Sequence, residues 1–296
     1  MSSDMIAQVR RFNRTVTQRA GVLYENYLAS GRSLGQDRVL WEIGADGCDV
    51  RDLRSRLDLD SGYLSRLLRA LQRDGLITVE PQADDRRVRT VWLTQAGRSE
   101  LQTLNARSDD AAAAILTPLT ATQQTRLVQA MAEVERLLTA STVRIAECDP
   151  RRPEARFCLD TYYAELAQRF PAGFDPAVSP VADEEMTPPA GLLLVASLHG
   201  QPVGCGALIW YPDAVALVKR MWVAPSARGI GLGRRMLSEL ESRARDHGDR
   251  LVRLDTNAAL TEALNLYRTC GYREVAPFSD EPYANHWFEK SVAESV

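Results

Sequence analysis

The sequence has few cysteines and no long apolar run. Its five cysteines, among 296 residues, are widely scattered and form no Cys-x-x-Cys pair, which argues against a disulfide framework or a zinc knuckle. No apolar run approaches the roughly eighteen residues that a membrane-spanning helix needs, and the initial stretch MSSDMIAQVRR lacks the apolar core of a signal peptide. We therefore expect a cytoplasmic protein with buried thiols, no membrane partner and no metal site.

Length and composition are those of a soluble globular protein with two domains. The chain is 45% hydrophobic and 25% charged, which is ordinary for globular proteins. The first half carries a slight excess of basic side chains and the second half an acidic excess. The stretch ECDPRRPEARF, which has two prolines and many charges, predicts a boundary near Asp149–Pro153. The predicted domains are therefore residues 1–148 and 153–296.

Apolar residues recur at helical spacing at both ends of the first domain. One amphipathic helix is predicted over Met5–Ala29, with a stripe formed by Ile6, Val9, Phe12, Val16, Leu23 and Tyr27. A second helical region is predicted from Ala96 to Glu147. Pro118 divides this region into two pieces, and Thr120 or Thr122 caps the second piece.

Between these helices the sequence predicts a helix-turn-helix. The segment VRDLRSRL is followed after three residues by SGYLSRLLRALQRDG, which Asp60 or Ser61 caps and Gly75 closes. The second helix is expected to bury Leu64, Leu67, Leu68 and Leu71. Its outward side is then expected to contact DNA bases and phosphates through Ser61, Tyr63, Ser65, Arg66 and Arg69.

A basic hairpin follows the second helix. The segments LITVEP and VRTVWLT alternate as two strands around a tip that carries Arg86, Arg87 and Arg89, which suits contact with phosphates or the minor groove. Residues Met5–Glu147 thereby resemble the MarR family of winged-helix transcriptional regulators. The resemblance implies a mainly α-helical winged helix-turn-helix domain with long dimerisation helices. It also implies a homodimer that binds a palindromic operator in double-stranded DNA, and a small-molecule effector.

The second domain alternates helices and strands. A helix is predicted over Glu154–Phe170, followed by an irregular Pro-rich segment over 171–191 of a length typical of functional lids. The runs LLLVASL, VGCGALIWY and AVALVKRMWV then predict an antiparallel meander. A helix in RRMLSELESRAR, a strand in RLVRLDT, a helix in LTEALNLYRTC and a last strand near NHWFEKSV complete the expected order.

The stretch SARGIGLGRR, between the third strand of the meander and the next helix, predicts an anion site. Glycines at a helix start direct backbone N–H groups and the positive end of the helix dipole at one place, which favours phosphate. A Walker loop is excluded because no Gly-Lys-Ser/Thr follows. Gly229 and Gly231 begin a dinucleotide-binding frame, but Arg234 occupies its sixth position and the preceding strands form a meander.

The pattern that fits throughout is Arg228, Gly231 and Gly233 between strand and helix, followed by Asn265 and Tyr267 and by the Gly271–Tyr272 turn. With it, residues Glu154–Ser291 resemble the GNAT family, the Gcn5-related N-acetyltransferases. The resemblance implies an α+β fold with a mixed, largely antiparallel sheet, and a site for acetyl-coenzyme A. The residues expected to bind this donor are Met221, Trp222, Val223, Arg228, Gly229, Ile230, Gly231, Leu232, Gly233, Arg234, Asn265 and Tyr267.

Acetyl transfer needs a group that polarises the thioester carbonyl and an acid for the departing sulfur. Backbone N–H groups of the strand segment Met221–Val223 are expected to serve the first need, and Tyr267 the second. Many GNAT relatives have a glutamate as base where this sequence has Leu217. Water, His286 or Tyr283 remain as candidates, or the amine arrives already deprotonated.

The acceptor is expected to be a small amine or an amino-acid-like molecule, with Arg220 and Tyr283 as substrate-binding residues. Arg220 is placed to pair with a carboxylate or to lie on the solvent face of the sheet. The acidic excess of the second domain favours a cationic acceptor instead, so the two cues conflict. The sequence thus predicts a bifunctional regulator and N-acetyltransferase; the alternative is a regulator whose second domain senses acetyl-coenzyme A or a metabolite without turnover.

Overall fold

The computed structural model describes residues 2–20, 27–81, 89–171 and 173–293. The chain divides into two compact units, Met1–Ala132 and Glu133–Val296. Among the described residues, no helix combines the length and the apolar character that crossing a membrane requires.

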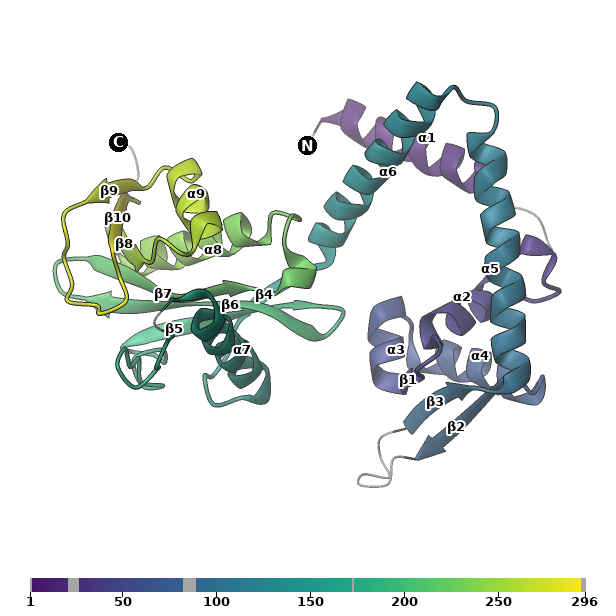
Figure 1. Cartoon of the computed structure of the whole chain (residues 1–296), viewed down its shortest axis with the longest axis horizontal. Coiled ribbons are helices and arrows are strands. Elements are labelled where there is room, and N and C mark those ends of the chain that lie inside the picture. The colour runs from purple at the N-terminus through teal and green to yellow at the C-terminus, as the bar shows by residue number, and fades with distance from the viewer. Residues whose placement is uncertain (1, 21–26, 82–88, 172, 294–296) are drawn as a thin grey trace. The chain divides into compact units, whose positions relative to one another are not determined.

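The first unit is mainly helical (Figure 1). Its elements are α1 (Ser3–Arg19), η1 (Tyr27–Ala29), α2 (Leu34–Ile43), β1 (Cys48–Asp49), α3 (Val50–Leu57), α4 (Ser61–Arg73), β2 (Ile77–Pro81), β3 (Arg89–Leu93), α5 (Gln95–Leu116) and the first part of α6 (Ala121–Thr142). The three short strands form a sheet in the order β1-β3-β2. This arrangement confirms the predicted helix-turn-helix, hairpin and long helices.

Local signals explain why α4 forms where it does. The Asp60 side chain caps the helix by accepting a hydrogen bond of 2.8 Å from the Tyr63 backbone N–H. The four leucines predicted to be internal, Leu64, Leu67, Leu68 and Leu71, are all buried. They pack with α2, α3 and the hairpin into one core, which fixes the outward face of α4.

The first helix is shorter than predicted. α1 ends at Arg19 instead of continuing to Ala29. Leu28 and Ala29 adopt left-handed φ values of 51° and 49°, which a right-handed helix cannot include. Leu23, also assigned to the apolar stripe, lies outside the described residues.

The end of the predicted second helical region is also different. α6 ends at Thr142, and Arg144–Glu147 form strand β4, which pairs antiparallel with β5 (Gly191–Leu198). Val143 is buried, and the alternation of Val143 and Ile145 matches the period of a strand. The expected boundary at Asp149–Pro153 therefore falls inside the second unit, whose sheet already includes β4.

The second unit is built around a seven-stranded sheet in the order β4-β5-β6-β7-β8-β10-β9. β7 and β8 are parallel and the other pairs antiparallel, which confirms the mixed, largely antiparallel sheet. Besides β4 and β5, its elements are α7 (Pro153–Arg169), β6 (Gln201–Tyr211), β7 (Val215–Val223), η2 (Pro225–Ala227), α8 (Leu232–His247), β8 (Leu251–Thr256), α9 (Thr261–Thr269), β9 (Arg273–Val275) and β10 (His286–Ser291).

Helices cover both faces of this sheet, as Figure 1 shows for α7 and α8. Residues Val203–Ile209 of β6 are buried without alternation, which requires cover on both faces. On one face the Cys158 thiol of α7 contacts the Gly204 carbonyl oxygen at 3.6 Å, and on the other Leu240 of α8 packs over Gly206. β6 is thus the centre of the hydrophobic core.

Candidate functional site

The site begins where β7 and β8 separate. These parallel strands pair only from Val215 with Leu251 to Val218 with Leu254. Beyond that point β7 continues to Val223 along β6, and its other edge has no strand partner in the part of the chain that the structure describes. An unpaired strand edge leaves backbone N–H and C=O groups free for a ligand.

A cleft of about 690 Å³ lies beside this open edge. It is lined by η2, the following loop, the start of α8, and residues of α7 and α9. Ile230 is the one expected donor-binding residue that does not line it; the Ile230 side chain packs against the core instead. The predicted residues that do line it are Met221, Trp222, Val223, Arg228, Gly229, Gly231, Leu232, Gly233, Arg234, Asn265 and Tyr267.

The glycine loop has the geometry of an anion site. Gly229 and Gly231 adopt φ values of +79° and +81°, and a Cβ atom at either position would meet no atom within 4 Å. Gly231 caps α8 without any side-chain hydrogen bond, so the N–H groups of the first helical turn remain available. Gly233 serves packing, because a Cβ there would lie 3.2 Å from the Leu266 side chain. The loop therefore fits a diphosphate.

Glu165 of α7, which the sequence analysis did not identify, lies in this cleft. Its carboxylate accepts hydrogen bonds from Arg228 Nη2 at 2.6 and 2.7 Å and from Trp222 Nε1 at 2.9 Å. Arg169 adds a third donor at 3.3 Å. Burial alone would raise the pKa of Glu165, but these hydrogen bonds outweigh burial and hold its pKa below the ordinary value.

Tyr267 stands between the cleft and a second pocket. It is buried in α9 and lines both cavities, together with Tyr162 and Met221. Burial raises the pKa of the Tyr267 phenol, so this hydroxyl keeps its proton through the physiological range. Asn265, two residues earlier, is exposed on the cleft side.

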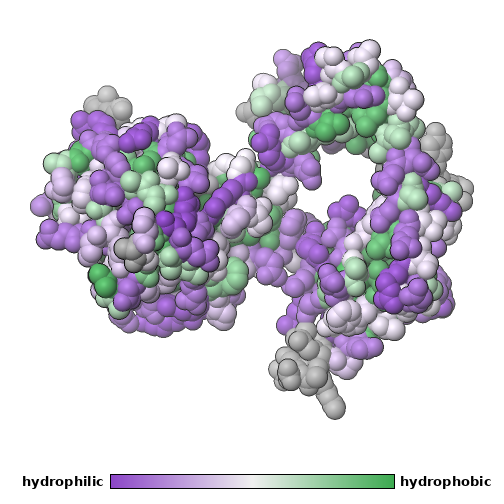
Figure 2. Space-filling model, viewed as in Figure 1, coloured by the Kyte–Doolittle hydropathy of each residue, from purple (hydrophilic) through white to green (hydrophobic). Residues whose placement is uncertain are grey.

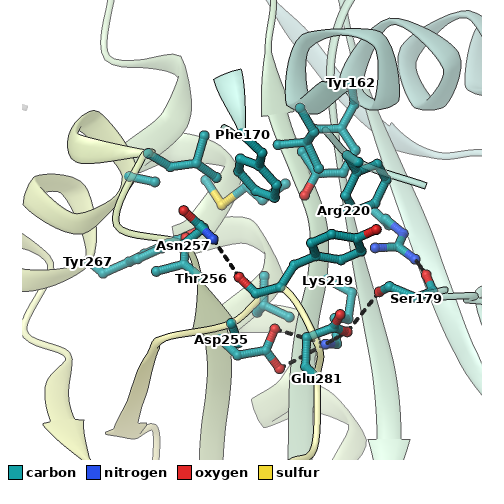
Figure 3. A pocket seen from close by; sticks show the side chains of 18 residues that line it. Tyr162, Phe170, Ser179, Lys219, Arg220, Asp255, Thr256, Asn257, Tyr267 and Glu281 are labelled. Carbon is teal, nitrogen blue, oxygen red and sulfur yellow. Dashed lines mark hydrogen bonds and ion pairs between the residues drawn. The ribbon is translucent and has the colours of Figure 1, made fainter. Parts of the chain in front are cut away.

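The second pocket has a volume of about 70 Å³. Both residues expected to bind the acceptor line it, namely Tyr283 and Arg220, of which Figure 3 labels Arg220. Phe170, Phe174 and Tyr162 also line it. The Tyr283 ring packs 4.7 Å from Phe174 between ring centres, and its hydroxyl accepts a 2.9 Å hydrogen bond from the Asp175 backbone N–H.

Charged side chains form the floor of this pocket (Figure 3). Lys219 Nζ, at the point where β7 and β8 separate, lies 2.8 and 2.9 Å from the two Asp255 carboxylate oxygens. It also lies 3.1 Å from Glu281 Oε2, and the Ser179 hydroxyl donates to the same oxygen at 2.8 Å. All three charged side chains are largely buried.

Arg220 does not lie on the solvent face of the sheet, which was one of its two expected positions. It is 5% exposed. The register between β6 and β7 shifts between Cys205 and Ala207, and Arg220 takes a left-handed φ of 54°. This bulge redirects the Arg220 side chain into the interior.

His286 is not brought to the site, although the sequence analysis named it as a catalytic candidate. It begins β10, and its Nδ1 lies 2.5 Å from Glu274 Oε1. It lines neither cavity, and its ring lies on the same side of β10 as buried Phe288, with 6.4 Å between the ring centres. Leu217, at the position of the missing glutamate, is a buried apolar residue.

The site residues that were not predicted from the sequence come from five segments: α7, β7, β8 and two irregular segments. Tyr162 and Glu165 lie three residues apart on α7, so they share a helix face. Lys219 and Asp255 directly follow the last paired residues of two neighbouring parallel strands, Val218 and Leu254, which places them close together. Glu281 and Ser179 belong to irregular segments and carry no such signal.

Of the residues proposed to contact DNA, those that the structure describes lie on α4 and at the start of β3. Ser61, Arg66 and Arg69 are exposed, and Ser65 is half-buried. Tyr63 packs partly on the core, and the Arg66 guanidinium lies 5.6 Å from its ring centre. Arg89 is exposed at the start of β3, whereas Arg86 and Arg87 lie outside the described residues.

Two segments of the chain match models of known families. Residues 159–272 match the acetyltransferase (GNAT) family, and residues 30–88 match the MarR family. The chain therefore combines a MarR-family segment with a GNAT-family segment, which confirms both resemblances.

Individual relatives match the chain over shorter stretches. A relative named IAA acetyltransferase, from Azospirillum brasilense, is 41% identical over 30% of this chain and 58% of its own length. An uncharacterised N-acetyltransferase of Schizosaccharomyces pombe is 32% identical over 33% of this chain and 61% of its own length. A GNAT-family acetyltransferase from Staphylococcus aureus Mu50 is 18% identical, with a TM-score of 0.45, over 51% of this chain and 99% of that one. The chain thus spans about three fifths of the curated relatives' own lengths.

Proposed function

We propose that the chain joins a DNA-binding regulator to an acetyl-coenzyme A dependent N-acetyltransferase that acts on a small amine or an amino-acid-like acceptor. One observation carries the enzymatic part. The cleft combines a glycine loop at a helix start, an unpaired edge of β7 and a buried tyrosine, and it adjoins a pocket that contains charged side chains. The GNAT-family match over 159–272 supports the same activity.

Each part of the cleft has a chemical task in this proposal. The N–H groups of Arg228–Arg234 bind the diphosphate of the acetyl donor. The open edge of β7 from Lys219 to Val223 binds the amide groups of the donor and polarises its carbonyl. The donor supplies an activated thioester. Tyr267, which retains its proton, donates that proton to the departing sulfur.

The regulatory part rests on the exposed face of α4 and the MarR-family match. Arg66 and Arg69 are free to approach DNA phosphates and bases from that face, and Arg89 extends it toward the hairpin. A palindromic operator, a small-molecule effector and a cytoplasmic location belong to the proposal as well.

A homodimer is the expected form because α1 has an apolar face and no buried residue. Five large apolar side chains of this helix are at least 41% exposed: Met5, Ile6, Val9, Phe12 and Val16. Val128 and Met131 of α6 are exposed in the same way. Figure 2 shows apolar residues at the surface of this end of the first unit. A second copy that covers these side chains would remove them from water.

One observation favours the alternative that the second unit only senses its ligand. Leu217, a buried apolar residue, occupies the place of the glutamate that many GNAT relatives use as a base. Such a sensor would bind acetyl-coenzyme A, change DNA affinity and release no thiol.

The test is thiol release from acetyl-coenzyme A by the full chain, measured across a panel of primary amines and amino acids. Acetylated product and free thiol in equal amounts would support the enzyme. Saturable binding of the donor without thiol release would favour the sensor. No binding of the donor would refute both forms of the proposal.

A further inference from the structure

Two oppositely charged side chains of the acceptor pocket have buried atoms without hydrogen-bond partners among the described residues. These atoms are Arg220 Nε and Glu281 Oε1. Both residues line the pocket of about 70 Å³ that adjoins the donor cleft through Tyr267. A buried polar atom without a partner is costly, and at a pocket it indicates a ligand that completes its hydrogen bonds.

Arg220 holds a positive charge that no carboxylate of the described residues neutralises by contact. Arg220 is buried, with only 5% of its surface exposed, and yet it forms no ion pair within the described residues. One of its Nη atoms donates to the Ser179 carbonyl oxygen, and its guanidinium lies 5.3 Å from the centre of the Tyr163 ring. Both of these partners are neutral, so the guanidinium is prepared for an anionic group.

Glu281 belongs to a cluster of side chains with an excess of negative charge. Lys219 is shared between Asp255 and Glu281, so these three side chains together carry one unneutralised negative charge. The Glu281 Oε2 atom is occupied by Lys219 and the Ser179 hydroxyl, which leaves Oε1 for a ligand. Ser179 contacts Arg220 through its carbonyl and Glu281 through its hydroxyl, and thereby fixes the two groups relative to each other.

The remaining walls limit the size of the ligand. A volume of about 70 Å³ suits a small ligand of a few heavy atoms, and the pocket shares Tyr162, Met221 and Tyr267 with the adjoining donor cleft. The aromatic side chains of Tyr162, Phe170, Phe174 and Tyr283 line it. These walls favour a small ligand over a bulky one.

We propose that the acceptor is a small zwitterionic amino acid, whose carboxylate binds Arg220 and whose ammonium group is oriented by Glu281. This inference rests on the proposed transferase function and resolves the two conflicting cues from the sequence, because one molecule supplies both charges. The ammonium first loses a proton to water. Its nitrogen then forms a bond to the acetyl carbon as the carbon–sulfur bond breaks. Tyr267 gives its proton to sulfur and regains one from the new amide nitrogen.

The experiment compares matched acceptors with the full chain. Alanine, alaninamide and ethylamine share an amino group, but only alanine carries a carboxylate. Thiol release gives KM and kcat for each acceptor. We expect alanine to have a KM at least about 10-fold lower than alaninamide or ethylamine, because only alanine forms the charge-assisted bonds to Arg220.

Arg220→Met should raise the KM for alanine about 10-fold or more and leave that for alaninamide within about twofold. Arg220→Lys keeps the positive charge, so its KM for alanine should lie between those of the wild type and Arg220→Met. Coenzyme A affinity, measured by calorimetry, checks that both variants are folded. Glu281→Gln provides a second probe and should weaken the binding of every ammonium-bearing acceptor.

Several outcomes separate this inference from the proposed function. Thiol release that is equal or faster with the amide and ethylamine would overturn the zwitterion and leave the transferase intact. If thiol release occurs with no acceptor, the transferase proposal is refuted, and calorimetric titration with alanine then tests whether the pocket binds a zwitterion. Alanine binding that is lost in Arg220→Met would then support the ligand class, and no alanine binding would overturn it.

Discussion

Arg228 donates through a single Nη2 atom to both carboxylate oxygens of Glu165, at 2.6 and 2.7 Å. The pair joins α7 to the glycine loop and lies inside the donor cleft. Arg228 is therefore held by a carboxylate at the place where the proposed ligand brings a diphosphate. A negative charge of the protein and one of the ligand compete for the same guanidinium.

Glu165→Gln should consequently strengthen the binding of coenzyme A. Removal of the carboxylate charge ends the competition and the repulsion of the diphosphate, and we expect the Kd to fall by about threefold to tenfold. Calorimetric titration measures this change. Glu239→Gln, on an exposed face of α8, is the matched control and should have no effect. Weaker binding in Glu165→Gln would mean that Glu165 positions Arg228 instead of competing for it.

Tyr267→Phe removes only the hydroxyl that is proposed to protonate sulfur. We expect kcat to fall by about 100-fold or more, the range of general acid catalysis, while the Kd of coenzyme A changes little. Tyr272→Phe is the control, because Tyr272 is equally buried and its ring lies 6.0 Å away, but it lines neither cavity. Equal turnover in the Tyr267 variant and the wild type would remove Tyr267 from its role as acid.

Arg66→Ala and Arg69→Ala should weaken DNA binding. Each exposed arginine that contacts a phosphate contributes about one unit to the slope of log affinity against log salt. The measurement uses a duplex that the wild-type chain selects from random-sequence DNA, titrated at several salt concentrations. Arg126→Ala, on α6, is the control. Unchanged affinity and slope in both variants would contradict the assignment of this face of α4 to DNA.

The second unit should lose stability in acid as Glu281 becomes protonated. Burial alone would raise its pKa, but Ser179 and Lys219 outweigh burial and hold the pKa below its ordinary value. Such a group stabilises the fold fully above the unfolded pKa of about 4.3 and loses this contribution as the pH falls through the folded pKa.

The expected result is that Glu281→Gln destabilises the second unit at pH 7 and shows a smaller further loss below about pH 4 than the wild type. Near-ultraviolet circular dichroism during urea unfolding at several pH values measures both effects. Glu239→Gln, at a partly exposed carboxylate of α8, is the control. Parallel pH profiles in Glu281→Gln and the wild type would refute this account of Glu281.

Sequence patterns predicted the elements whose structure depends on residues that are close together in the sequence. The leucine spacing of α4, the short apolar runs of β5 to β7 and the glycines before α8 each contain their own signal. Strand β4 was predicted as helix because Arg144–Glu147 follow a long helical stretch, and only pairing with β5 makes them a strand.

The part of the site that lies within one continuous motif could be predicted from the sequence. The donor loop from Arg228 to Arg234 is contiguous, and all but Ile230 of its residues line the cleft. The acceptor pocket is different, because Arg220, Glu281 and Ser179 meet only through the bulge in β7 and two irregular segments. Such contacts depend on tertiary structure, and no spacing in the sequence encodes them.

The most direct test of the donor site is calorimetric titration of coenzyme A into the wild-type chain, Gly231→Ala and Gly248→Ala. Both glycines have left-handed φ values, +81° and +98°, and open space around a Cβ atom, so each substitution costs a similar backbone strain of about 1 kcal/mol. Only Gly231 lines the cleft. We predict saturable binding that Gly231→Ala weakens and Gly248→Ala preserves. Absence of binding to the wild-type chain, or equal weakening by both substitutions, would contradict a diphosphate site at the start of α8.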